Sequence, residues 1–217
     1  MVSNLTCQMS IQEIISQLIT GLRQTTVLEY IAVFFGIGSV LFSRVENILV
    51  YPVGLVNTTI YIYLSIKGNL FGEASVNFYY TVMSIYGWIL WTKKDKQMHY
   101  VVHITKSNRT EWIQQLAFFS GCYIIIYIAL LILKKYFAPG AIPAADAFAS
   151  ATAFTGMWLM ARKKVESWYW WIATNIASIP LYFIKGFVFT SFYYLVLLLL
   201  AFSGLIAWMR RSKLSVM

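Results

Sequence analysis

The residues best suited to chemistry are aromatic and carboxamide side chains that interrupt apolar stretches of the chain. Trp168, Trp171, Asn175 and Ser178 are separated by three, four and three residues, a spacing that places them on one face of a helix. An indole face attracts a cationic ring, and a carboxamide both donates and accepts hydrogen bonds. This stripe predicts a binding site for a flat ring with polar edges.

A second polar stripe lies about ninety residues earlier. Its members are Asn77, Tyr80, Ser84 and Trp88, with Tyr86 close by, and Asn57 adds a carboxamide to a neighbouring apolar stretch. Polar side chains inside membrane spans are costly and tend to mark functional sites. The alternative is that the tryptophans anchor helices at the membrane interface and the asparagines join helices by hydrogen bonds. The residue types favour neither interpretation over the other.

The composition identifies the environment in which these stripes lie. Of 217 residues, 59% are hydrophobic and only 12% are charged, whereas a soluble domain has about 25% charged residues. This excludes a soluble enzyme and predicts an all-α integral membrane protein. Seven segments are long and apolar enough to cross a bilayer: Val27–Ser43, Ile48–Ile66, Ala74–Thr92, Leu116–Leu133, Ala141–Ala161, Trp168–Ile184 and Phe187–Met209. Trp91 and Trp208, beside basic residues at segment ends, are predicted to be interface anchors.

The basic residues predict the orientation of these segments. Twelve of the 17 lysines and arginines fall on one side: Arg44, Lys93, Lys94, Lys96, Lys106, Arg109, Arg162, Lys163, Lys164, Arg210, Arg211 and Lys213. Because basic loops are cytoplasmic, we expect the N-terminus outside and the C-terminus in the cytoplasm. The net charge of +9 is thus explained by topology, and no nucleic-acid partner is expected.

The acidic residues and histidines narrow the mechanism. Glu29, Glu73 and Asp146 lie near segment ends, and the lack of a carboxylate at a segment centre favours passive transport over ion coupling. Asp146 could equally cap its helix. His99 and His103 lie in a loop without a third ligand, so no metal site is expected. Their position also disfavours a membrane-embedded enzyme, and polar residues gathered at one depth disfavour a channel.

An internal repeat predicts the architecture. A shift of 118 residues brings Gly38 onto Gly156, Arg44 onto Arg162 and Asn57 onto Asn175. With one residue of slack, Gly87 and Trp91 fall on Gly204 and Trp208. Since four crossings separate the partners, the halves have the same orientation, as in transporters with parallel repeats.

The predicted organisation has six parts. An amphipathic surface helix (1–26) carries an apolar face from Ile11 to Leu22. A signal peptide is the alternative interpretation, but this segment has no basic region followed by a continuous apolar stretch. Two parallel three-helix bundles, joined by a linker helix, form the body. The remaining ranges are 27–92 for the first bundle, 93–111 for a basic cytoplasmic loop, 112–135 for the linker helix, 136–209 for the second bundle and 210–217 for the tail.

Three sequence elements resemble the Pnu family of bacterial vitamin transporters. They are Ser84-Ile85-Tyr86-Gly87-Trp88-x2-Trp91, Ser150-Ala151-Thr152-x4-Trp158-Leu159-x2-Arg162-Lys163-Lys164-Val165-Glu166-x-Trp168, and Trp168-x2-Trp171-x3-Asn175. The resemblance runs from Glu29 to Trp208 and is strongest to the PnuC branch, which carries nicotinamide riboside. A sister branch (PnuT-like) carries thiamine, which is also a flat cationic heteroaromatic.

The resemblance implies a SWEET-like 3+1+3 arrangement of helices in a homotrimer of the bacterial inner membrane. It also implies facilitated diffusion without a cofactor, with a cytoplasmic kinase trapping the vitamin for NAD biosynthesis. Trp168, Trp171 and Asn175 would surround the nicotinamide ring and its amide. The second stripe departs from the family, because Asn77 replaces a common glutamine and Ser84 a common asparagine.

Overall fold

Every predicted apolar segment forms a helix. The structure is a computed structural model, and it describes residues 11–68, 71–136 and 142–214. The helices are α1 (Ile11–Gln24), α2 (Val27–Arg44), α3 (Val50–Lys67), α4 (Phe71–Thr92), α5 (Arg109–Tyr136), α6 (Pro143–Ala161), α7 (Ser167–Ile184) and α8 (Val188–Leu214). The first ten residues of the predicted surface helix lie outside the described part.

Local sequence signals explain where these helices begin. α2 starts with a capping box, in which Thr26 and Glu29 exchange side-chain and backbone hydrogen bonds. α6 starts at Pro143, which lacks the N–H that the first turn leaves unbonded. α5 begins at Arg109, seven residues before the predicted Leu116, because Asn108 and Glu111 form a reciprocal cap there.

Three of the described helices, α2, α5 and α8, are long and apolar enough to cross a membrane by length and composition alone. The sequence predicts seven crossings. The other four predicted segments have polar side chains along their length, such as Thr58 in α3 and Asn175 in α7, and both are buried. These two polar side chains are therefore turned toward neighbouring helices.

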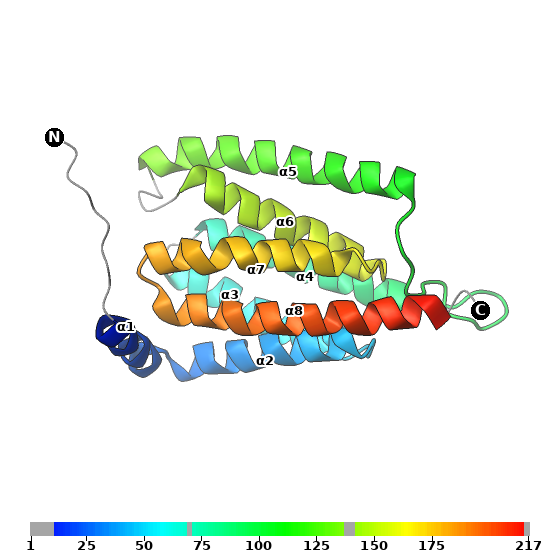
Figure 1. Cartoon of the computed structure of the whole chain (residues 1–217), viewed down its shortest axis with the longest axis horizontal. Coiled ribbons are helices and arrows are strands. Elements are labelled where there is room, and N and C mark those ends of the chain that lie inside the picture. Colours follow the sequence, from blue (N-terminus) through cyan, green and yellow to red (C-terminus); the bar gives the residue numbers. More distant parts are fainter. Residues whose placement is uncertain (1–10, 69–70, 137–141, 215–217) are drawn as a thin grey trace.

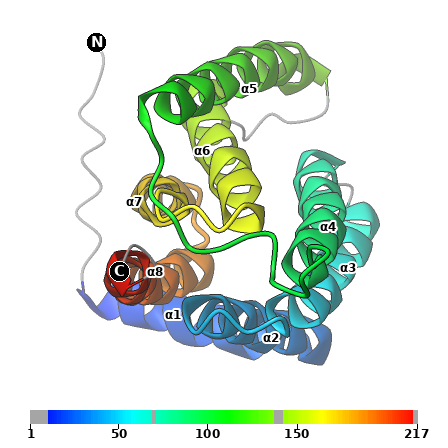
Figure 2. The same ribbon diagram turned by 90° about the vertical axis from the view of Figure 1, so that its right-hand side faces the viewer.

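Six helices form a closed ring. Successive contacts run from α2 to α3, α4, α6, α7, α8 and back to α2, as the end-on view in Figure 2 shows. Within the ring, α2–α4 and α6–α8 are two sets of three, which meet at the α4–α6 and α2–α8 seams. The repeat relates α2 to α6 and α4 to α8, so the α4–α6 seam and the α2–α8 seam are equivalent.

Two helices lie outside the ring. α5 packs mainly on α6 and also meets Trp170 of α7, which donates to Gln115 at 3.1 Å and packs near Phe119. One side of α5 faces outward (Figure 2). α1 packs on α8, where Gly21 lies against the Phe189 side chain. Figure 1 shows α1 across one end of the bundle, roughly perpendicular to the long helices.

The connections divide between the two ends of the bundle. Residues 45–49, 93–108 and 162–166 and the end of α8 gather at one end, opposite α1 (Figure 1). The twelve basic residues assigned to one side by the sequence all belong to these connections or to the adjoining helix ends. We call this the basic end.

The structure corrects the register of the repeat. α3 starts 117 positions before α7, and the same offset relates Tyr51 to Trp168 and Gly87 to Gly204. The predicted shift of 118 is therefore wrong for α3 and α7. One residue turns a helical side chain by about 100°, so the counterpart of Asn175 is Thr58 rather than Asn57. Thr58 and Asn175 are both buried.

Candidate functional site

The α7 stripe meets α4 inside the ring. Trp171 packs on Gly156 of α6, where a β-carbon would lie 3.3 Å from the indole nitrogen. Its ring centroid is 6.0 Å from that of Tyr80, and Tyr80 also meets Phe154 edge to face. The predicted residues Trp171 and Tyr80 are thus brought together across the α4–α6 seam, although they are 91 positions apart.

Asn175 lies one turn further along α7 and is only 3% exposed. Its carboxamide makes no hydrogen bond with the described part of the chain, whereas buried amides are normally bonded. Ser178, on the same stripe, is also buried. A buried carboxamide with free donors and acceptors beside an aromatic pair can bind a planar ring that carries an amide.

The α4 stripe is only partly turned inward. Ser84 is buried, as are Gly87 and Trp91 on the same face. Tyr86 and Trp88 are 41% and 38% exposed on other faces of the helix. Tyr80, Ser84, Gly87 and Trp91 therefore form the inward stripe, and the structure does not bring Tyr86 and Trp88 to Trp171.

The two remaining asparagines donate to backbone carbonyls. Asn57 of α3 donates to the Ala32 carbonyl of α2 at 2.6 Å, and Asn77 donates to the Glu73 carbonyl one turn earlier in its own helix, α4, at 2.9 Å. The Asn57 bond joins two helices, as in the alternative that the sequence left open, whereas the Asn77 bond does not.

Trp168 belongs to a row of aromatic side chains at the basic end, away from Tyr80. The aromatic row consists of Tyr51, Trp91, Trp208 and Trp168, in that order. Consecutive ring centroids are 5.1, 6.2 and 5.6 Å apart, and the two outer pairs meet edge to face. All four side chains are buried, and they belong to one apolar core cluster.

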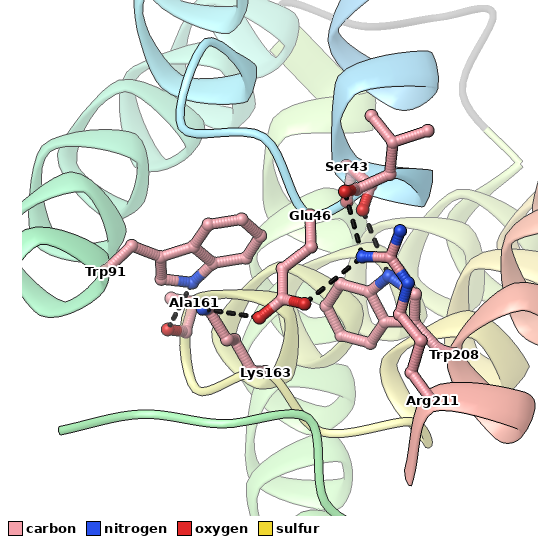
Figure 3. A network of polar contacts seen from close by, with 8 residues as sticks. Ser43, Glu46, Trp91, Ala161, Lys163, Trp208 and Arg211 are labelled. Atoms are coloured by element: carbon pink, nitrogen blue, oxygen red, sulfur yellow. Dashed lines mark hydrogen bonds and ion pairs between the residues drawn. The ribbon is translucent and has the colours of Figure 1, made fainter. Parts of the chain in front are cut away.

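Reciprocal hydrogen bonds fix this row across both seams (Figure 3). Trp91 of α4 donates to the Ala161 carbonyl at the end of α6, at 3.1 Å. Its repeat partner, Trp208 of α8, donates to the Ser43 carbonyl near the end of α2, at 3.0 Å. The prediction that Trp91 and Trp208 are interface anchors is wrong, because both rings are buried and bonded between the two sets of helices.

A carboxylate joins the same two sets beside the row. Glu46, in the α2–α3 connection, accepts from Lys163 Nζ at 2.7 Å and from Arg211 at 3.2 Å (Figure 3). Lys163 Nζ also lies 4.6 Å from the Trp91 ring centroid. From the sequence, Lys163 was used only to predict topology, and the available hint to this contact was Glu46 itself, an acidic residue two positions after Arg44.

Replacing Glu46 by glutamine is expected to destabilise the basic end. The Lys163 side chain is only 7% exposed, so removal of its anion leaves a poorly hydrated cation. We expect a loss of about 1–3 kcal/mol in the free energy of unfolding, between the values for exposed and fully buried pairs. The thermal unfolding midpoint of the purified protein measures this. Glu111→Gln, which removes a pair with Lys164 of similar length and exposure, should lower the midpoint less because it removes one ion pair rather than two. An unchanged midpoint in Glu46→Gln would contradict the role given to this carboxylate.

The other acidic residues named by the sequence lie at helix starts. Glu29 completes the α2 capping box, and Asp146 accepts from the Ile142 N–H at 2.7 Å and also pairs with Lys185. Capping thus accounts for Glu29 and, together with the Lys185 pair, for Asp146. Glu73 lies in the first turn of α4. Among the described residues, His, Cys, Asp and Glu side chains form no group of three that could hold a metal ion.

Comparison with known proteins gives concordant matches. The family model described as nicotinamide mononucleotide transporter matches residues 26–210. The chain is similar to the nicotinamide riboside transporter PnuC of Escherichia coli, with 21% identity over 212 residues and 86% of each chain covered. It is also similar to the riboflavin/roseoflavin transporter RibM of Streptomyces davaonensis, with 26% identity over 147 residues, 67% of this chain and 68% of RibM.

A solved structure shares the fold. The crystal structure of the vitamin B3 transporter PnuC matches with a TM-score of 0.69 and 21% identity, over 92% of this chain and 88% of that chain. The all-helical architecture predicted from the sequence is therefore that of a known transporter structure.

Proposed function

The chain belongs to the nicotinamide mononucleotide transporter family, and from this premise we propose that it carries nicotinamide riboside into the bacterial cytoplasm by facilitated diffusion. The observation that carries the choice of cargo is the buried, unbonded Asn175 beside the Trp171–Tyr80 pair. A nicotinamide ring has the flat cationic face that the aromatic pair suits. Its carboxamide complements that of Asn175.

The proposed cargo site comprises Trp171, Asn175, Tyr80 and Ser84, with Trp168 at its boundary with the basic end. Four further residues of the predicted site have weaker support. Asn57 and Asn77 have intramolecular acceptors, and Tyr86 and Trp88 are exposed away from Trp171. The proposed site lies between the two sets of helices, and binding of substrate between the repeats in parallel-repeat transporters supports this position.

The proposed topology has seven crossings, α2 to α8, with the basic end in the cytoplasm. Two parallel three-helix bundles, α2–α4 and α6–α8, are joined by α5 as linker. The gathering of basic residues at one end supports this orientation, and α1 lies at the opposite end, on the outer surface. A homotrimer in the inner membrane and a kinase that traps the vitamin complete the proposal on the basis of the family resemblance.

The proposed mechanism is alternating access. The aromatic row and Glu46 close the basic end in this conformation, and release into the cytoplasm requires the two sets to separate there. No ion coupling is included, since Glu29 and Asp146 cap their helices and Glu73 lies in the first turn of α4 rather than at its centre. The concentration gradient of the cargo alone sets the direction of net flux, and binding of the cargo shifts the populations of the two conformations.

Thiamine and riboflavin are the competing cargoes. Thiamine is favoured by its own flat cationic ring and by Ser84, which replaces the asparagine common in the family. Riboflavin is favoured by the similarity to RibM. All three could stack on Trp171.

Direct binding to the purified protein separates them. Titration calorimetry with nicotinamide riboside, thiamine and riboflavin is expected to show saturable binding of nicotinamide riboside, with the other two weaker by at least about tenfold. Tight binding of thiamine or riboflavin alone would reassign the cargo.

A further inference from the structure

The first set of helices has its own version of the α7 stripe. At the structural offset of 117, Trp168-x2-Trp171-x3-Asn175 corresponds to Tyr51-x2-Gly54-x3-Thr58 of α3. Tyr51, Gly54 and Thr58 are all buried. A search for identical residues does not find this correspondence, because the two stripes have different residue types at all three positions.

The two stripes begin with equivalent packing. The Tyr51 ring lies over Gly87 of α4 and meets Trp91 edge to face, with an interplanar angle of 85°. The Trp168 ring lies over Gly204 of α8 and meets Trp208 edge to face at 87°. The first residue of each stripe therefore occupies the same place in its own set.

These two residues also share an unusual polar feature. Tyr51 Oη and Trp168 Nε1 are the side-chain polar atoms that are fully enclosed, with essentially no solvent contact, and lack a hydrogen-bond partner in the described part of the chain. Burial of an unbonded donor is costly, and each such group in a folded protein calls for an explanation. That the two unbonded atoms occupy repeat-related positions points to a shared role.

The second positions of the stripes differ in a complementary way. Where α7 has Trp171 packed on Gly156, α3 has Gly54. A β-carbon at Gly54 would lie 3.3 Å from the Ser39 hydroxyl and 3.8 Å from the Ser84 hydroxyl. The second set thus presents aromatic faces and a carboxamide, and the first set presents hydroxyl groups. A cargo that consists of an aromatic ring and a polyhydroxylated substituent would match these two surfaces, with its ring on the second set and its hydroxyl groups on the first.

We propose that Tyr51 is a further cargo-binding residue, the first-set counterpart of Trp168. Its hydroxyl hydrogen-bonds the sugar portion of the cargo when the aromatic row separates and the basic end opens. This inference rests on the proposed function, since it needs a cargo that passes between the two sets. It assigns the sugar to the hydroxyls of α2–α4 and the heteroaromatic ring to α7.

Tyr51→Phe tests the proposal by removing one oxygen and keeping the ring. We expect the dissociation constant of nicotinamide riboside for the purified variant to rise about tenfold, the effect of one lost hydrogen bond at the upper end of its usual range. The unfolding midpoint of the unliganded variant should stay the same or rise, because an unbonded hydroxyl is removed from the interior. Tyr63→Phe, at a 56% exposed tyrosine of the same helix, is the matched control and should change neither quantity.

A purely structural role for Tyr51 gives a different result. The variant would then bind nicotinamide riboside as tightly as the wild type, which overturns the inference and leaves the proposed function intact. A lower unfolding midpoint together with an unchanged dissociation constant has the same meaning. If the wild-type protein binds none of the three vitamins, the proposed function and this inference both fall.

Discussion

Replacing Asn175 by alanine will abolish uptake of nicotinamide riboside while leaving the protein folded in the membrane. The carboxamide has no hydrogen bond with the described chain to lose, so the fold is little affected. The cargo amide, by contrast, loses its partner in a buried site, which we expect to weaken binding by roughly 10- to 100-fold. Trp171→Ala removes the aromatic face and should have the same result. Uptake of labelled nicotinamide riboside, normalised to the amount of protein in the membrane fraction, measures both.

Two control variants make this result specific. Ile176, the next residue of α7, is exposed, and Ile176→Ala should transport normally. Trp88→Ala should also transport normally, because Trp88 is turned away from Trp171. If Asn175→Ala and Trp171→Ala both retain normal uptake, the cargo lies elsewhere. If Trp88→Ala alone abolishes it, the site extends to the outer face of α4.

Gly204→Ala is expected to disrupt the basic end of the fold. A β-carbon at this position would overlap the six-membered ring of Trp168, which is buried and held against Trp208. The strain of inserting a methyl group into a packed core is typically about 1–3 kcal/mol. The expected result is a lower unfolding midpoint and less monodisperse protein on size exclusion. Gly87→Ala should behave alike, because a β-carbon there overlaps the Tyr51 ring.

Gly121→Ala is the control variant, for which we do not expect the unfolding midpoint to fall. Gly121 lies in the middle of α5, where a β-carbon meets nothing within 4 Å. Alanine is favoured over glycine in a helix by up to about 1 kcal/mol, so this variant should be as stable as the wild type or slightly more stable. Equal unfolding midpoints for Gly204→Ala and Gly121→Ala would mean that packing of the Trp168 ring does not require glycine at position 204.

The helices were predictable because long apolar segments end at residues with clear signals. Val27 and Ile184 are the same in the prediction and in the structure, and the charge pattern identified the end at which the connections gather. The repeat was detected from identical residues, and this is why its register in α3 and α7 was one residue out. Tyr51 corresponds to Trp168, and Thr58 to Asn175, through equivalent packing of different side chains.

The site was less predictable, because periodicity shows which side chains share one face of a helix but does not show which helix packs against that face. The spacing of Ser84 and Trp88 allowed both on one stripe, yet Trp88 is exposed and Gly87 takes the inward position. Trp91 and Trp208 have the sequence context of interface anchors, beside basic residues at the ends of predicted membrane segments. Only the approach of α6 and α2 gives their indole N–H groups buried carbonyl acceptors.

Trp91 and Trp208 each take their hydrogen-bond acceptor from the other set of helices, which has a consequence for opening of the basic end. One bond crosses the α4–α6 seam and the other crosses the α2–α8 seam, so separation of the two sets at this end requires both bonds to break. The basic end therefore stays joined as long as either bond remains.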